Sequence, residues 1–162
     1  MIRDRILHHS RAFRSAAWQQ LLLGCTVASP GIAWLVASYG FGLPTSDPLR
    51  DLPLLVLAAT AEEIVFRGGL QVALAQRYWG QWRWMPVARL PWLSLTSANL
   101  ITGVIFALMH LWRHPAPAAL AVLPVSLLLG LSFEWSGRLR VPVMLHLWFN
   151  VSLWAASFLM RP

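Results

Sequence analysis

The sequence has no lysine, one cysteine and very few acidic residues, and each shortage excludes a class of protein. Its thirteen basic residues are all arginines, set against six aspartates and glutamates in a chain of 162 residues. Charged residues make up 12% of the chain and apolar residues 57%, whereas a soluble globular domain carries about 25% charged residues. The composition excludes an ordinary soluble domain and indicates an integral membrane protein.

The single cysteine, Cys25, excludes a disulfide within the chain and a metal site built from thiolates. It lies in an apolar run, and we interpret it as a small buried hydrophobic residue. The motifs of several intramembrane proteases are also missing, because we find no GxSxG serine elbow and no GxGD aspartate motif. Asp4, Asp47 and Asp51 lie outside the apolar runs or at their edges. We therefore expect no serine, cysteine or aspartic protease mechanism.

Apolar runs of membrane-spanning length dominate the sequence. A helix needs about 20 apolar residues to cross the hydrocarbon core, and five spans are predicted at residues 16–39, 51–76, 92–112, 116–133 and 141–159. We expect an all-α fold, a polytopic transmembrane helical bundle of about five spans that forms one membrane-embedded domain over 16–162. Residues 1–15 form a basic cytoplasmic or interfacial tail in this prediction. The third span begins at Trp92 or Thr96, with Thr96 or Ser97 as its N-cap.

Arginine and tryptophan gather between the apolar runs. Residues 77–89 contain three tryptophans, one tyrosine and three arginines, which is typical of a belt at headgroup level. The arginine distribution predicts a cytoplasmic N-terminus and contact with anionic lipids, so no nucleic-acid partner is expected. In that orientation the inner segments hold Arg3, Arg5, Arg11, Arg14, Arg77, Arg83, Arg89, Arg138 and Arg140, and the outer ones hold Arg50, Arg113 and Arg161.

The second apolar run contains Glu62 and Glu63 side by side, with Arg67 one helical turn further on. Each charge at the centre of a membrane helix costs about 2.5–3.5 kcal/mol, so three cost roughly 8–10 kcal/mol before any pairing. Charges at this depth indicate a functional site. Glu63 and Arg67 are four residues apart and can pair along the helix, whereas Glu62 points about 100° away. We therefore predict Glu62 as a general base.

Two more predicted spans carry polar residues at helical spacing, Phe106 with His110 and His146 with Asn150. Residues four apart share one face of a helix, and we expect these faces to point into the bundle rather than toward lipid. His110 could share a proton with Glu62 or orient a water molecule. His146 and Asn150 could donate hydrogen bonds to a forming oxyanion. Together the three groups predict an acyl-transfer site in which water is the nucleophile.

The same residues resemble three motifs of the CPBP family of intramembrane proteases, the CAAX-processing and bacteriocin-protection group. Glu-Glu-Ile-Val-Phe-Arg at 62–67 is similar to the family's EExxxR motif. Phe-Ala-Leu-Met-His at 106–110 is similar to FxxxH, and His-Leu-Trp-Phe-Asn at 146–150 is similar to HxxxN. The resemblance implies a catalytic core over about residues 52–157 and a compact bacterial member of the family.

The resemblance also implies a role for each motif residue. Glu62 would activate water with help from His110, and His146 and Asn150 would stabilise the oxyanion. No metal or cofactor is implied. The substrate would be a membrane-anchored protein or peptide, and the lipid bilayer of a bacterial inner membrane would surround the site. The supporting residues would be Glu63, Arg67 and Phe106.

Two other functions remain open at this point. A zinc-dependent membrane hydrolase could use Glu62, His110 and His146 as ligands, although no HExxH spacing occurs in the sequence. A non-catalytic peptide-binding or immunity membrane protein could use the same polar residues to hold a peptide. A transporter is disfavoured, because five short spans show no pseudo-symmetric halves.

Overall fold

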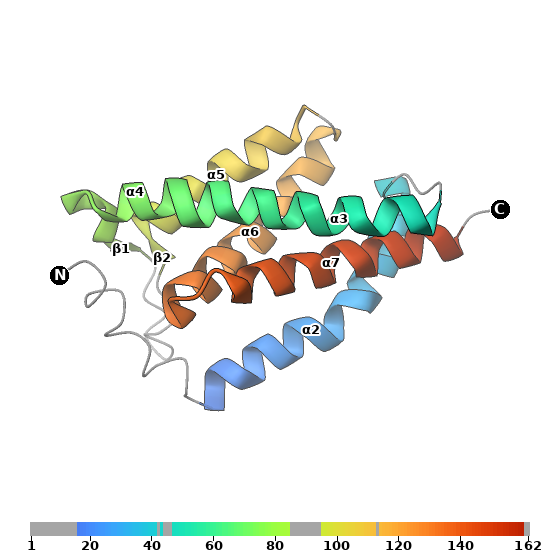
Figure 1. Ribbon diagram of the computed structural model, residues 1–162, viewed down its shortest axis with the longest axis horizontal. Helices are drawn as coiled ribbons and strands as arrows, with labels where there is room; N and C mark the ends of the chain where they lie inside the picture. Colours follow the sequence, from blue (N-terminus) through green and yellow to red (C-terminus); the bar gives the residue numbers. More distant parts are fainter. Residues whose placement is uncertain (1–15, 42, 44–46, 85–94, 113, 161–162) are drawn as a thin grey trace. The chain divides into compact units, whose positions relative to one another are not determined.

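Helices account for most of the computed structural model, which describes residues 16–41, 43, 47–84, 95–112 and 114–160 (Figure 1). A 3₁₀ turn, η4 (Tyr78–Gln81), and two antiparallel strands, β1 (Arg83–Trp84) and β2 (Leu95–Thr96), lie between the helices that end at Ala75 and begin at Ser97. The helices, in chain order, are α2 (Ala16–Val36) with the π-helical η2 (Ala37–Phe41), α3 (Pro48–Glu63) with the π-helical η3 (Ile64–Gln71) and α4 (Val72–Ala75), α5 (Ser97–His110), α6 (Ala116–Ser136) and α7 (Arg140–Leu159).

The predicted all-α membrane fold is confirmed. Three of the described helices are long and apolar enough to cross a membrane, over Gln19–Gly40, Ala116–Ser136 and Arg140–Leu159. The helix through α3 and η3 carries the charged residues Glu62, Glu63 and Arg67. Helix α5 is apolar but has only 14 residues. Large apolar side chains such as Leu23 and Met144 are mostly exposed on the helices, as surfaces that face acyl chains should be. The chain is an integral membrane protein.

The described helices form two compact units, whose sequences meet between Glu62 and Glu63 and again between Pro142 and Val143. Unit 1 contains residues 63–142 and therefore η3, α4, the two strands, α5 and α6. Unit 2 contains α2, α3 as far as Glu62 and nearly all of α7.

In unit 1, α5 and α6 run antiparallel, because Asn99 near the start of α5 lies beside Leu127 and Gly130 in the second half of α6. The predicted N-cap of α5 is confirmed, since the Thr96 hydroxyl accepts a hydrogen bond from the Asn99 backbone N–H at 3.0 Å. At its other end α6 stops at Gly137, whose φ of 60° gives the left-handed C-cap that glycine favours.

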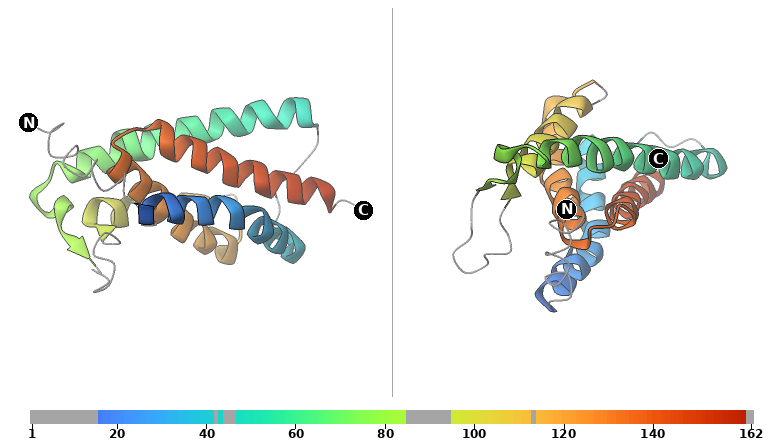
Figure 2. Two further views of the ribbon diagram at one scale, coloured as in Figure 1. Left: turned by 90° about the horizontal axis from the view of Figure 1, so that it is seen from below. Right: turned by 60° about the vertical axis from the view of Figure 1, so that its left-hand side comes forward.

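In unit 2, α7 runs antiparallel to α3 and parallel to α2. The Trp154 indole donates to the Asp51 carboxylate at the start of α3, over 3.2 Å. The Trp148 indole donates to the Thr26 carbonyl of α2 over 2.9 Å. Figures 1 and 2 both show α7 running alongside α3. Such hydrogen bonds between helices stabilise packing in a bilayer, where apolar contact alone gives little preference for protein over lipid.

The close packing of α5 on α6 yields a prediction for Gly130. A Cβ added there would lie 2.0 Å from Asn99 Oδ1, so Gly130→Ala should lower stability by about 1–3 kcal/mol. The thermal midpoint of the purified protein should fall by roughly 2–4 °C for each kcal/mol. Gly24→Ala in α2 is the matched control, because no atom lies within 4 Å of its added Cβ. Equal midpoints for the two variants would show that the contact is looser than described.

Candidate active site

Three polar side chains, Glu63, Arg67 and Gln71, follow one another at four-residue intervals where α3 passes into η3. Glu63 and Arg67 are 0% exposed and Gln71 is 1% exposed. A four-residue step in an α-helix overshoots a full turn by about 40°. The π-helical η3 turns less per residue, so the three side chains stay on one side of the helix. This polar stripe lies within unit 1, where Arg67 and Gln71 contact α6.

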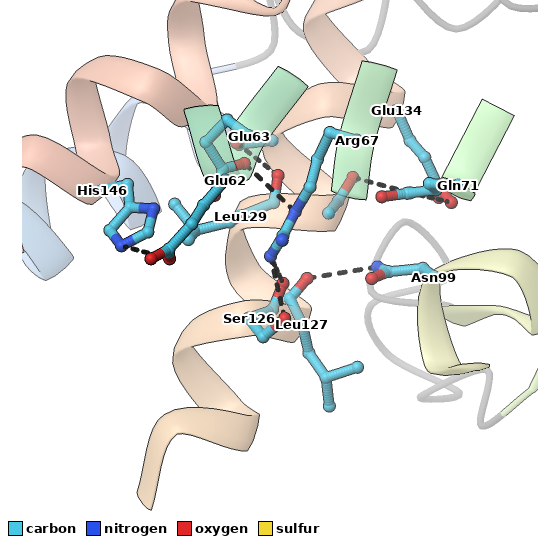
Figure 3. Close-up of polar contacts among 12 residues, drawn as sticks. Glu62, Glu63, Arg67, Gln71, Asn99, Ser126, Leu127, Leu129, Glu134 and His146 are labelled. Carbon is cyan, nitrogen blue, oxygen red and sulfur yellow. Dashed lines mark hydrogen bonds and ion pairs between the residues drawn. The ribbon is translucent and has the colours of Figure 1, made fainter. Parts of the chain in front are cut away.

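Arg67 has partners of three kinds: a carboxylate, hydrogen-bond acceptors and an aromatic ring (Figure 3). Its Nε lies 3.1 Å from Glu63 Oε2, so the predicted ion pair is present. Its Nη2 donates to both the carbonyl and the hydroxyl oxygen of Ser126, at 2.9 and 2.8 Å. The guanidinium carbon also lies 4.7 Å from the centre of the Phe106 ring, within the range of a cation–π contact. These partners stabilise a charge that membrane burial would otherwise make costly.

Phe106 connects the stripe to His110. Its ring is 1% exposed and lies 4.7 Å from the His110 ring and 4.9 Å from the Phe66 ring, between centroids. The same ring therefore touches the Arg67 guanidinium and the His110 imidazole. The FxxxH spacing has a physical basis here, because one turn of α5 places the histidine against the aromatic ring that contacts the arginine.

The tautomer of His110 follows from its hydrogen bond. His110 Nδ1 lies 2.8 Å from the carbonyl oxygen of Phe106, and a carbonyl can only accept, so Nδ1 carries a proton. In the neutral ring the lone pair is then on Nε2. The side chain is half-buried, and the ring of His114 stacks on it with centroids 6.0 Å apart. His110 can therefore accept a proton at Nε2 without reorienting.

Unit 2 brings Glu62 next to His146. Glu62 Oε2 lies 3.8 Å from His146 Nε2, longer than a hydrogen bond and within ion-pair range if the histidine is protonated. The Glu62 side chain is 37% exposed and that of His146 is 7% exposed. Asn150 follows one turn later on α7 and is half-buried. Of the predicted site residues, unit 2 thus holds Glu62, His146 and Asn150, and unit 1 holds Glu63, Arg67, Phe106 and His110.

Several polar residues in unit 1 were not predicted. The Gln71 amide donates to Glu134 Oε1 at 3.0 Å and to the Gly130 carbonyl at 3.3 Å. The Thr96 hydroxyl donates to the same Glu134 oxygen, and the Asn99 amide donates to the Leu127 carbonyl at 3.1 Å. The four-residue step beyond Arg67 could have indicated Gln71. Glu134, one residue beyond the fourth predicted span, lies within α6, which continues to Ser136.

The chain matches the family model described as type II CAAX prenyl endopeptidase Rce1-like over residues 44–152. The matched segment is more than half of the 162 residues and includes every predicted site residue from Glu62 to Asn150. No curated protein and no solved structure matches the chain. The chain belongs to the type II CAAX prenyl endopeptidase Rce1-like family, which confirms the resemblance to CPBP proteases and places it among the proteases of the membrane.

The Glu63–Arg67 pair yields a stability prediction. Arg67→Met should lower the free energy of unfolding by about 3–5 kcal/mol, because it leaves the Glu63 charge buried without its cation. The double variant Glu63→Gln/Arg67→Met should recover much of this loss, since the buried charge is then gone. Thermal midpoints of the purified proteins measure both effects. A double variant as unstable as the sum of the two single variants would mean that the residues are not coupled.

Proposed function

We propose that the chain hydrolyses a peptide bond of a membrane-anchored protein or peptide with water activated by Glu62. The observation that supports this proposal is the contrast between the two adjacent carboxylates. Glu63 is fully buried against Arg67, whereas Glu62 keeps a side chain that is 37% exposed and lies 3.8 Å from His146. Of these two carboxylates, Glu62 is the one that water can reach and that has a histidine beside it, an arrangement suited to a general base for water.

In the proposed reaction Glu62 takes a proton from water, and the water oxygen attacks the carbonyl carbon of the substrate. The carbonyl becomes an oxyanion, to which His146 and Asn150 donate hydrogen bonds. His110, whose Nε2 can accept a proton, assists Glu62 in holding the proton. The proton then passes to the nitrogen of the leaving amine as the carbon–nitrogen bond breaks. Glu63 and Arg67 fix the rotation of the helix that carries Glu62, and Phe106 supports Arg67.

The proposed substrate is anchored in the same membrane as the protease. The name of the matching family specifies prenylated CAAX substrates, and we propose the broader class of peptides near the C-terminus of a membrane-anchored chain. We also propose a bacterial inner membrane with the N-terminus in the cytoplasm, because this orientation puts most arginines on the inner side. The reaction as proposed needs no cofactor and no nucleic-acid partner.

The mechanism predicts that Glu62→Gln abolishes cleavage, with a loss of at least about 10²-fold, while the thermal midpoint stays close to that of the wild type. The amide has nearly the shape of the carboxylate but cannot take up a proton. Mass spectrometry of membrane proteins from cells with wild-type or variant enzyme measures the cleavage. Glu63→Gln is the matched control, and it should lower the thermal midpoint because Arg67 loses its buried ion pair.

Cleavage by Glu62→Gln at the wild-type rate would contradict the proposed base. A Glu62→Gln variant that lacks cleavage yet keeps full biological function would instead favour the peptide-binding or immunity function. The first outcome would refute Glu62 as the base, and the second would refute the assignment of the chain as an enzyme.

Chelation tests the zinc-dependent alternative. Among the residues that the structure describes, no group of three or more His, Cys, Asp and Glu side chains is placed to hold a metal ion. We expect the cleavage rate to be unchanged after prolonged treatment with a strong chelator. A rate that falls with chelation and returns when zinc is added would contradict the proposal and assign Glu62, His110 and His146 as ligands.

A further inference from the structure

Three buried oxygen atoms of neutral side chains in unit 1 have no hydrogen-bond partner among the described residues: Gln71 Oε1, Asn99 Oδ1 and Thr102 Oγ1. Each of these residues is 1% exposed. Buried polar atoms in native proteins are nearly always satisfied, either by protein groups or by ordered water. Three such oxygens in one unit therefore indicate a ligand that donates hydrogen bonds.

The amide groups are held in orientations that direct their nitrogens to protein acceptors. Asn99 Nδ2 donates to the Leu127 carbonyl at 3.1 Å. Gln71 Nε2 donates to the Gly130 carbonyl and to Glu134. Because carbonyls and carboxylates only accept, neither amide can be flipped without losing these bonds. The two amide oxygens can therefore only accept, and the Thr102 hydroxyl can donate or accept.

These residues come from two helical elements, η3 and α5, and two of them contact a third, α6. Asn99 and Thr102 are three residues apart and share one face of α5. Asn99 Oδ1 lies so close to Gly130 of α6 that an added Cβ would be 2.0 Å from it. Gln71, the last residue of η3, binds the carbonyl of the same glycine. Gln71 and Asn99 thus meet at Gly130, where the absence of a side chain admits the Asn99 amide.

We propose that Gln71, Asn99 and Thr102 hold ordered water inside unit 1, between η3, α5 and α6. Water is the smallest molecule that donates two hydrogen bonds, and a site with side chains 1% exposed is too enclosed for a peptide or lipid headgroup. The inference does not depend on the proposed function. Only its link to catalysis does: such water would lie along the polar stripe that begins at Glu63, the neighbour of the proposed base.

Nuclear magnetic resonance of the full chain in detergent micelles tests the site directly. The side-chain amide protons of Asn99 and Gln71 should give dipolar cross-peaks to water in a rotating-frame experiment, which distinguishes contact from proton exchange. The methyl protons of Leu129, which is 0% exposed, are the negative control and should give none. Absence of water cross-peaks from both amides in the wild-type protein would overturn the proposal.

Thermal stability of Thr102→Val gives a second, independent test. If Thr102 binds water, the loss of its hydroxyl should lower the thermal midpoint by about 2–4 °C. If its oxygen simply lacks a partner, the isosteric valine removes a buried polar atom and the midpoint rises, which would overturn the proposal. Thr102→Ser keeps the hydroxyl and should keep the water cross-peaks. Thr60→Val is the matched control, because its hydroxyl donates within its own helix to the Val56 carbonyl.

Neither measurement uses substrate cleavage. A chain that binds this water but cleaves nothing would refute the proposed function and leave the hydration site intact. A chain that cleaves its substrate but shows no bound water would refute the hydration site and leave the proposed function intact.

Discussion

The polar organisation of unit 1 depends on one buried interaction, the pairing of the Arg67 guanidinium with Glu63. A membrane protein can keep such charges at depth only if they are compensated within the protein. Glu63 supplies the opposite charge, Ser126 supplies two acceptors and Phe106 supplies an aromatic face. Each partner comes from a different part of the sequence, so the ion pair also fixes how η3, α5 and α6 pack.

The same pairing gives two adjacent glutamates different environments. Consecutive residues of a helix point about 100° apart, so a helix that directs Glu63 at α6 must direct Glu62 elsewhere. Glu62 keeps an exposed carboxylate beside His146, while Glu63 is sealed against Arg67. Two residues of one type can take different chemical roles when their surroundings differ in this way. The catalytic assignment proposed for Glu62 rests on this difference.

The positions of the helices and the Glu63–Arg67 ion pair were predictable from the sequence, because both depend on local spacing. Apolar runs gave helix positions within a few residues, Thr96 gave the N-cap of α5, and the four-residue step gave the Glu63–Arg67 pair. The strands β1 and β2 have two residues each, too few for an alternation pattern to show. The catalytic roles of the motif residues remain predictions.

The partners of Arg67 and Gln71 on α6 could not be predicted. A single serine in an apolar helix, such as Ser126, is common and carries no signal for the side chain that it binds. Glu134 comes just after the fourth predicted span, which ends at residue 133. Its position inside α6 depends on Gly137, which ends the helix three residues later, and on the donors Gln71 and Thr96. These contacts arise from tertiary packing, which periodicity does not encode.

The way α6 is bound has a consequence for sequence divergence. Arg67, Asn99 and Gln71 all donate to main-chain carbonyls of α6, those of Ser126, Leu127 and Gly130. A main-chain acceptor survives most substitutions, so these three hydrogen bonds tolerate changes in the side chains of α6, whereas the bonds to the Ser126 hydroxyl and the Glu134 carboxylate do not. This tolerance explains how a helix central to unit 1 can contribute no residue to the three motifs by which the chain resembles its family.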